Sequence, residues 1–108
     1  MKLNKAAEER ARGLIKSRQY VKESDWGEAN PNADAENDYL DGHNWEEYGA
    51  WHLGIHEDES EETKGRFGFP YGDFRRVHYA GLVAAKQRAA QQGYTDIEEA
   101  ADRLLELM

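Results

Sequence analysis

The stretch Lys64-Gly-Arg-Phe-Gly-Phe-Pro-Tyr-Gly-Asp-Phe-Arg-Arg-Val-His-Tyr-Ala-Gly-Leu-Val-Ala-Ala-Lys-Gln-Arg-Ala-Ala-Gln-Gln92 decides the fold that we expect for this chain. Its first part places Phe67, Phe69 and Tyr71 at alternate positions, a spacing that puts side chains on one side of an extended segment. Pro70 favours an extended conformation at the residue before it and has no amide hydrogen to donate to a neighbouring strand. We therefore predict a short extended arm, either free or at the edge of a sheet, that carries three aromatic side chains.

A long helix is predicted from Phe74 to Gln92, directly after the arm. Asp73 is expected to be its N-cap, accepting hydrogen bonds from the free amides of the first turn. The apolar face of this helix covers about half of its circumference, which is typical of a helix that packs on more than one side. That face consists mainly of small residues, namely Val77, Ala80, Gly81, Leu82, Ala84, Ala85 and Ala89. We expect this helix to be the centre of the fold.

Amphipathic helices are predicted at both ends of the chain. Residues 4–18 carry apolar side chains at helical spacing. Gly93 is expected to end the central helix, and Thr95-Asp-Ile-Glu98 has the pattern of a capping box that begins another helix. Because the connection at Gly93 is short, the last helix should fold back on the central helix as an antiparallel partner.

The segment between the first helix and the arm is predicted to form loops and two short helices. Residues 19–31 are expected to be an ordered loop in which Trp26 packs inward. A short helix is predicted over residues 34–40. The sequence Asn44-Trp-Glu-Glu47 resembles an N-cap followed by an acidic residue at the third helical position. It predicts a second short helix that continues towards Gly54.

The composition sets the class of protein that we expect. A length of 108 residues suits one domain, and the predicted fold is mainly α: a small, single-domain helical bundle over residues 1–108 with one short extended aromatic arm. The chain has no cysteine, which excludes disulfides and cysteine metal sites and makes the cytoplasm the expected location. No apolar run approaches the roughly 20 residues needed to span a membrane, and the first residues lack the apolar region of a signal peptide.

The formal net charge of -8 hides a strong segregation along the chain. Residues 2–22 and 64–92 each carry a net charge of +5, whereas residues 23–62 carry fourteen acidic residues and no lysine or arginine. Residues 93–108 carry a net charge of -4. One interpretation is that the acidic middle segment lies over the two basic helices and stabilises the monomer. The other is that a basic face serves an anionic partner.

Several motifs in the second half of the chain are distinctive: Trp51-His-Leu-Gly54, Glu62-Thr-Lys-Gly-Arg66, Phe69-Pro-Tyr-Gly-Asp-Phe74, Val77-His78, Ala84-Ala-Lys-Gln-Arg-Ala-Ala90 and Asp96-Ile-Glu98. On these motifs, which cover about half of the chain, the sequence resembles a family of small uncharacterised prokaryotic proteins. A weaker likeness links it to phage-associated segments in which an aromatic-proline approach precedes an alanine-rich helix. The family resemblance implies a bacterial or archaeal, cytosolic protein, and it implies no activity and no catalytic residue.

Two residue pairs were considered as chemical sites. His52 and His56 have the spacing of two metal ligands on one helix face, but a glycine between them and the lack of a third ligand predict that no metal binds. Asp73 and His78 could form a carboxylate–imidazole pair. Their separation of five residues is poor for a helix, and no serine or cysteine is nearby in the sequence to act as a nucleophile. We therefore expect no cofactor, no metal and no catalytic site.

A binding function is the expectation that remains. The candidate binding residues combine cations with aromatic side chains: Arg66, Phe67, Phe69, Tyr71, Arg75, Arg76 and His78. The leading hypothesis is a non-catalytic module that recognises another protein. The alternative is a small nucleic-acid-binding protein in which Arg75 and Arg76 contact phosphates while the aromatic residues of the arm stack on bases. The acidity of the chain opposes that alternative, and a metal-dependent hydrolase is the third choice.

Overall fold

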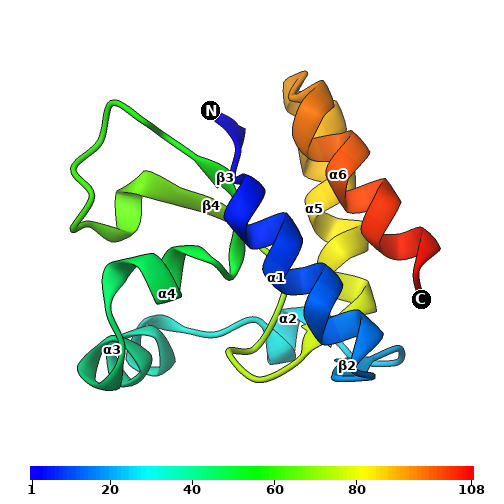
Figure 1. Ribbon diagram of the computed structural model, residues 1–108, viewed down its shortest axis with the longest axis horizontal. Helices are drawn as coiled ribbons and strands as arrows, with labels where there is room; N and C mark the ends of the chain where they lie inside the picture. The colour runs from blue at the N-terminus through cyan, green and yellow to red at the C-terminus, as the bar shows by residue number, and fades with distance from the viewer.

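The computed structural model describes all of residues 1–108 and contains six α-helices, one 3-10 turn and two small sheets (Figure 1). In chain order the elements are β1 (Lys2–Leu3), α1 (Lys5–Lys16), β2 (Tyr20–Val21), α2 (Trp26–Ala29), α3 (Ala33–Gly42), α4 (Trp45–Gly49), β3 (His52–Ile55), the 3-10 turn η1 (Lys64–Arg66), β4 (Phe67–Pro70), β5 (Val77–His78), α5 (Tyr79–Gln92) and α6 (Thr95–Glu106). About 56% of the residues are helical and 14% are in strands. The protein is therefore mixed α/β, and the prediction of a mainly α bundle was wrong.

The larger sheet has three antiparallel strands in the order β1-β3-β4. In the register of β3 and β4, Gly54 lies opposite Gly68, and the Met1 side chain lies against both glycines. A Cβ at Gly68 would come within 2.8 Å of the Met1 methyl carbon, so the close approach of Met1 requires a residue without a side chain there. The aromatic segment is thus the edge strand of a sheet, which is the position that Pro70 allows.

The helix α4 ends at Gly49, several residues before the predicted stop near Gly54. Its start agrees with the prediction, because Asn44 and Glu47 form a complete capping box. From His52 onward, however, the backbone pairs with both β1 and β4. The inter-strand hydrogen bonds and the burial of His52–Gly54 in the sheet outweigh the continuation of a short helix.

The long helix α5 begins at Tyr79, five residues after the predicted start at Phe74. Asp73 does accept hydrogen bonds from the next amides, those of Arg75 and Arg76. These amides belong to a loop, because Phe74 adopts a left-handed backbone with φ of 68°. Residues 77–78 then pair in parallel with β2 and form a second, unpredicted sheet.

The helices α1, α5 and α6 lie together on one side of the three-stranded sheet (Figure 1). The predicted antiparallel packing of α6 on α5 is confirmed. Gly93 ends α5 in a left-handed conformation with φ of 78°, as expected. The predicted capping box at Thr95 is absent: Tyr94 is the N-cap of α6 and makes no side-chain cap hydrogen bond. The core between these elements contains Ala7, Ala11, Ile15, Trp51, Leu53, Tyr71, Val77, Leu82, Ala85, Ala89, Ile97, Ala101 and Leu104.

An ion pair between a buried carboxylate and an exposed guanidinium joins the first and last helices. Glu8 on α1 is 7% exposed and accepts two hydrogen bonds from Arg103 on α6, each of 2.9 Å, and a third from Arg12. The hydrogen bonds from Arg103 and the positive charges outweigh the burial of Glu8 and lower the pKa of its carboxyl group. None of the six helices has the length and apolar character needed to cross a membrane.

Candidate functional site

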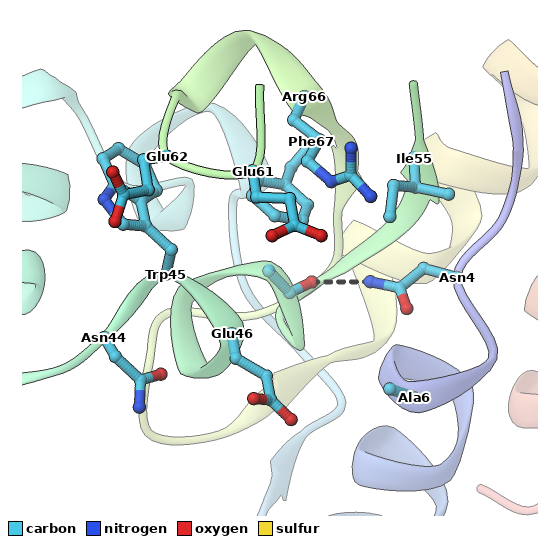
Figure 2. A pocket seen from close by; sticks show the side chains of 11 residues that line it. Asn4, Ala6, Asn44, Trp45, Glu46, Ile55, Glu61, Glu62, Arg66 and Phe67 are labelled. Carbon is cyan, nitrogen blue, oxygen red and sulfur yellow. Dashed lines mark hydrogen bonds between the residues drawn. The ribbon is translucent and has the colours of Figure 1, made fainter. Parts of the chain in front are cut away.

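A surface pocket of about 500 Å³ lies between α4, the amino end of α1 and the loop that connects β3 to β4 (Figure 2). It is lined by Asn4, Ala6, Asn44, Trp45, Glu46, Gly49, Ile55, Glu61, Glu62, Arg66 and Phe67. Asn4 fastens the two sides, because its side-chain amide donates to the carbonyl groups of Gly49 and His52 at 3.0 and 3.2 Å. These two hydrogen bonds hold the amino end of α1, which is one wall of the pocket, against the backbone that follows α4.

Two aromatic rings, together with Ala6 and Ile55, form the apolar part of this pocket. Trp45 and Phe67 both meet the buried Tyr48 edge-on, with ring centroids 5.7 and 5.8 Å away. The ring of Phe67 also lies over Gly49, where any Cβ would come within 3 Å of it. Tyr48 is itself held by a 3.0 Å hydrogen bond from its hydroxyl to Glu36. Burial and this carboxylate raise the pKa of Tyr48, which stays a neutral donor.

Three carboxylates line the pocket beside the rings. Glu46, Glu61 and Glu62 are all exposed and take part in no ion pair. Figure 2 shows the Glu61 carboxylate pointing into the hollow. The single cation of the lining, Arg66, donates instead to the backbone carbonyls of Glu57 and Glu59, at 3.4 and 2.8 Å. Arg66 thus holds the loop in place, and the pocket keeps a net negative charge.

The acidic middle segment makes few ion pairs with the basic stretches of the chain, so the extensive charge pairing of the first interpretation is not observed. Of the fourteen acidic residues in 23–62, only Glu36 and Glu57 form ion pairs, with Lys64 and Lys2. The cations that were expected to contact this segment form ion pairs with other residues. Lys86 pairs with Asp102 on α6, and Arg76 pairs with Asp73 in its own loop. The other twelve acidic side chains have no cationic partner, so the acidic segment is available to a partner outside the chain.

The aromatic residues of the arm point mostly into the protein. Tyr71 is fully buried, and its hydroxyl donates to the carbonyl of Ala50 at 2.6 Å. Phe69 is partly buried and meets Tyr94 edge-on, with ring centroids 6.0 Å apart. Of the seven predicted binding residues, the pocket contains Arg66 and Phe67, while Arg75 and Arg76 are exposed outside it.

His52 is a buried histidine of the sheet. Its Nδ1 donates to the carbonyl of Tyr48 at 3.0 Å. Burial lowers the pKa of His52 to about 4, against the smaller opposing effects of that hydrogen bond and of Glu36. No group of three or more histidine, aspartate or glutamate side chains in residues 1–108 is arranged to hold a metal ion.

His78 and Asp73 form a hydrogen-bonded carboxylate–imidazole pair, although their spacing in the sequence is poor for a helix. Its Nε2 lies 2.8 Å from a carboxylate oxygen of Asp73, and its Nδ1 lies 2.8 Å from the hydroxyl oxygen of Ser24. No serine is near this pair in the sequence, but one is near it in space: Ser24 is 54 residues away and reaches His78 through the pairing of β2 with β5. No sequence signal could have identified that contact.

The pocket residues Trp45, Glu46, Glu61 and Glu62 were also missed as a group. The capping box at Asn44 places Trp45 and Glu46 on the first turn of α4, which is a local signal. Glu61 and Glu62 belong to a charge run whose position beside that turn depends on Arg66 and the loop carbonyls.

Comparison of the chain with protein-family models, with curated proteins and with solved structures finds no match, so the resemblance to the prokaryotic family stays a prediction.

Proposed function

We propose that this protein is an interaction module that binds a lysine- or arginine-bearing segment of a partner protein in the pocket at α4. The observation that carries the proposal is that three unpaired carboxylates, Glu46, Glu61 and Glu62, line the same pocket as the rings of Trp45 and Phe67. Two kinds of contact with a cation are available there at once. Carboxylates form charge-assisted hydrogen bonds with ammonium or guanidinium groups, and an aromatic face attracts a cation by about 0.5–2 kcal/mol.

The charge of the surroundings supports a basic partner. Twelve carboxylates of the acidic segment are unpaired, and a surface of one sign speeds the approach of a partner of the opposite sign. A nucleic-acid partner is not favoured. Tyr71 is buried and cannot stack on a base, and the Arg66 guanidinium already donates to a loop carbonyl. The net charge of -8 also repels phosphates. A cytoplasmic location and a prokaryotic source remain predictions of the sequence.

Titration with a lysine hexapeptide, followed by the fluorescence of the tryptophans and by calorimetry, tests the proposal. We expect salt-sensitive binding that weakens at least about tenfold when Glu46, Glu61 and Glu62 are all changed to glutamine. A glutamate hexapeptide should not bind. Trp45→Ala should weaken binding while leaving the net charge unchanged.

A matched control separates the pocket from the overall charge. Asp38→Asn, Asp41→Asn and Glu106→Gln together remove the same three negative charges from exposed positions outside the pocket. This variant should keep most of the affinity. Equal weakening in the two triple variants would show that only the net charge matters and would contradict a binding pocket.

A further inference from the structure

Ser24, His78 and Asp73 form a continuous hydrogen-bonded chain that the interaction function does not use. The two links, from Ser24 Oγ to His78 Nδ1 and from His78 Nε2 to Asp73 Oδ2, both measure 2.8 Å. The imidazole is 4% exposed, whereas Ser24 is partly exposed at the surface. A buried imidazole thus lies next to a partly exposed serine.

The partners of Asp73 determine the direction of these hydrogen bonds. Its other carboxylate oxygen accepts from the amides of Arg75 and Arg76, at 3.0 and 2.7 Å. Burial opposes the charge of this carboxylate, but the hydrogen bonds from His78 and from these amides prevail and lower the pKa of Asp73. An ionised carboxylate only accepts, so Nε2 must donate to it. In the neutral imidazole, Nδ1 then has no proton and accepts a hydrogen bond from the Ser24 hydroxyl. A general base needs this arrangement.

The backbone holds the three side chains in this arrangement. In the second sheet, Val21 is paired with His78 and Tyr20 with Val77. The His78 amide donates to the carbonyl of Tyr71 at 3.0 Å, and the ring of Trp26 lies beside the imidazole with centroids 5.7 Å apart. The geometry therefore exists before any substrate arrives, which is the condition for an activated nucleophile.

We propose that Ser24 is a nucleophile, activated by His78 and oriented by Asp73, that accepts the acyl group of small carboxylic esters. As the bond from Ser24 Oγ to the carbonyl carbon forms, the hydroxyl proton passes to His78 Nδ1. When the carbon–oxygen bond to the leaving group breaks, that proton passes to the departing alcohol. Water then attacks the acyl group in the same way and restores the serine, so that the products are a carboxylic acid and an alcohol.

Labelling with a fluorophosphonate, followed by peptide mapping, tests the nucleophile in the intact chain. We expect Ser24 to be modified at least about tenfold faster than Ser17 or Ser60, which have no imidazole partner. Asp73→Asn should slow the labelling of Ser24 by at least about tenfold, because the amide no longer holds the imidazole in the required tautomer. Equal labelling of the three serines would overturn the proposal. So would an undiminished rate in a folded Asp73→Asn variant.

The absence of native cysteine provides a second measurement that does not depend on the folding of the Asp73 variant. Ser24→Cys and Ser60→Cys each place one thiol in the chain, and their alkylation by iodoacetamide near neutral pH can be compared directly. A base beside the thiol promotes the reactive thiolate, so the thiol at position 24 should react at least about tenfold faster. A rate equal to or below that at position 60 would overturn the proposal.

Discussion

Tyr71 is the residue through which the aromatic strand is joined to the rest of the core. It is 0% exposed, and its hydroxyl donates to the carbonyls of Ala50 and Ala7 at 2.6 and 3.4 Å. These two carbonyls come from segments that are far apart in the sequence. A single hydroxyl therefore links the end of α4, the first helix and the segment that follows β4.

Tyr71→Phe should lower the free energy of unfolding by about 1–3 kcal/mol, because two carbonyls lose a buried donor while the packing of the ring is kept. Urea denaturation measures this change. Tyr79→Phe is the matched control, since Tyr79 is 40% exposed and its hydroxyl makes no hydrogen bond within the chain. Equal effects at the two positions would contradict the role of the buried hydroxyl.

His52 should make the stability of the protein depend on pH. Its pKa is about 4 in the folded protein and about 6.5 in the unfolded chain, so the unfolded state takes up a proton first as the pH falls. The contribution of the neutral His52 to folding stability is then fully present above the unfolded pKa, and it is lost as the pH falls from about 6.5 to 4. By pH 5 the loss amounts to about 2 kcal/mol.

Denaturation curves from about pH 7.5 to 5 check this prediction. His52→Asn keeps a donor for the carbonyl of Tyr48 but does not titrate, so its stability should fall by about 2 kcal/mol less than that of the native protein over this range. If the native protein and His52→Asn fell in parallel, the buried imidazole would not be the titrating group.

At the scale of elements, the start of α5 shows how packing controls a helix. Gly81 lies in its first turn, where a Cβ would come within 2.8 Å of the carbonyl oxygen of Tyr71 and 3.0 Å of the Trp26 ring. The backbone of the strand segment and α2 are therefore packed directly on the helix. Gly13 in α1 has no atom within 4 Å of the same position.

Alanine substitution at these two glycines should have opposite effects. In an open helical position, Gly→Ala stabilises by roughly 0.5–1 kcal/mol, and this gain is expected for Gly13→Ala. Gly81→Ala should instead destabilise by about 1–3 kcal/mol, because a backbone carbonyl must move to admit the methyl group. Chemical denaturation measures both, and stabilisation by Gly81→Ala would show that α5 is not packed so closely.

At the scale of the whole molecule, repulsion exceeds attraction among the surface charges. The net charge is -8, and twelve of the fourteen acidic residues in 23–62 have no cationic partner. The exposed ion pairs that do exist contribute little individually, about 0–1 kcal/mol each. Screening should therefore relieve more repulsion than the attraction that it removes.

The melting temperature should rise when salt increases from about 0.05 to about 0.5 M. Asp38→Asn, Asp41→Asn and Glu61→Gln together should raise the melting temperature at low salt and reduce its dependence on salt, because they remove part of the repulsion. A thermal melt followed by circular dichroism measures both effects. A melting temperature that falls with salt would mean that attractive pairs dominate the surface.

Several local features of the chain were predictable from the sequence because they depend on groups within about four residues of each other, although the equally local capping box predicted at Thr95 does not form. The apolar spacing of α1 and α6, the capping box at Asn44 and the left-handed stop at Gly93 are all of this kind. The hydrogen bonds of the two helix ends close inside one turn of chain, so the residue types there are a direct guide to them.

Contacts between distant segments were decided only by the tertiary structure. The strands β1, β2 and β5 have two residues each, too few for an alternating pattern, so the mixed α/β class was not visible in the sequence. Phe74 is held out of α5 because Val77 and His78 pair with β2. The same pairing brings Ser24 to His78, as the loop held by Arg66 brings Glu61 to α4. Each of these short segments has many possible strand or loop partners. Which partner it contacts depends on the packing of the whole core, and this is not encoded in the local sequence.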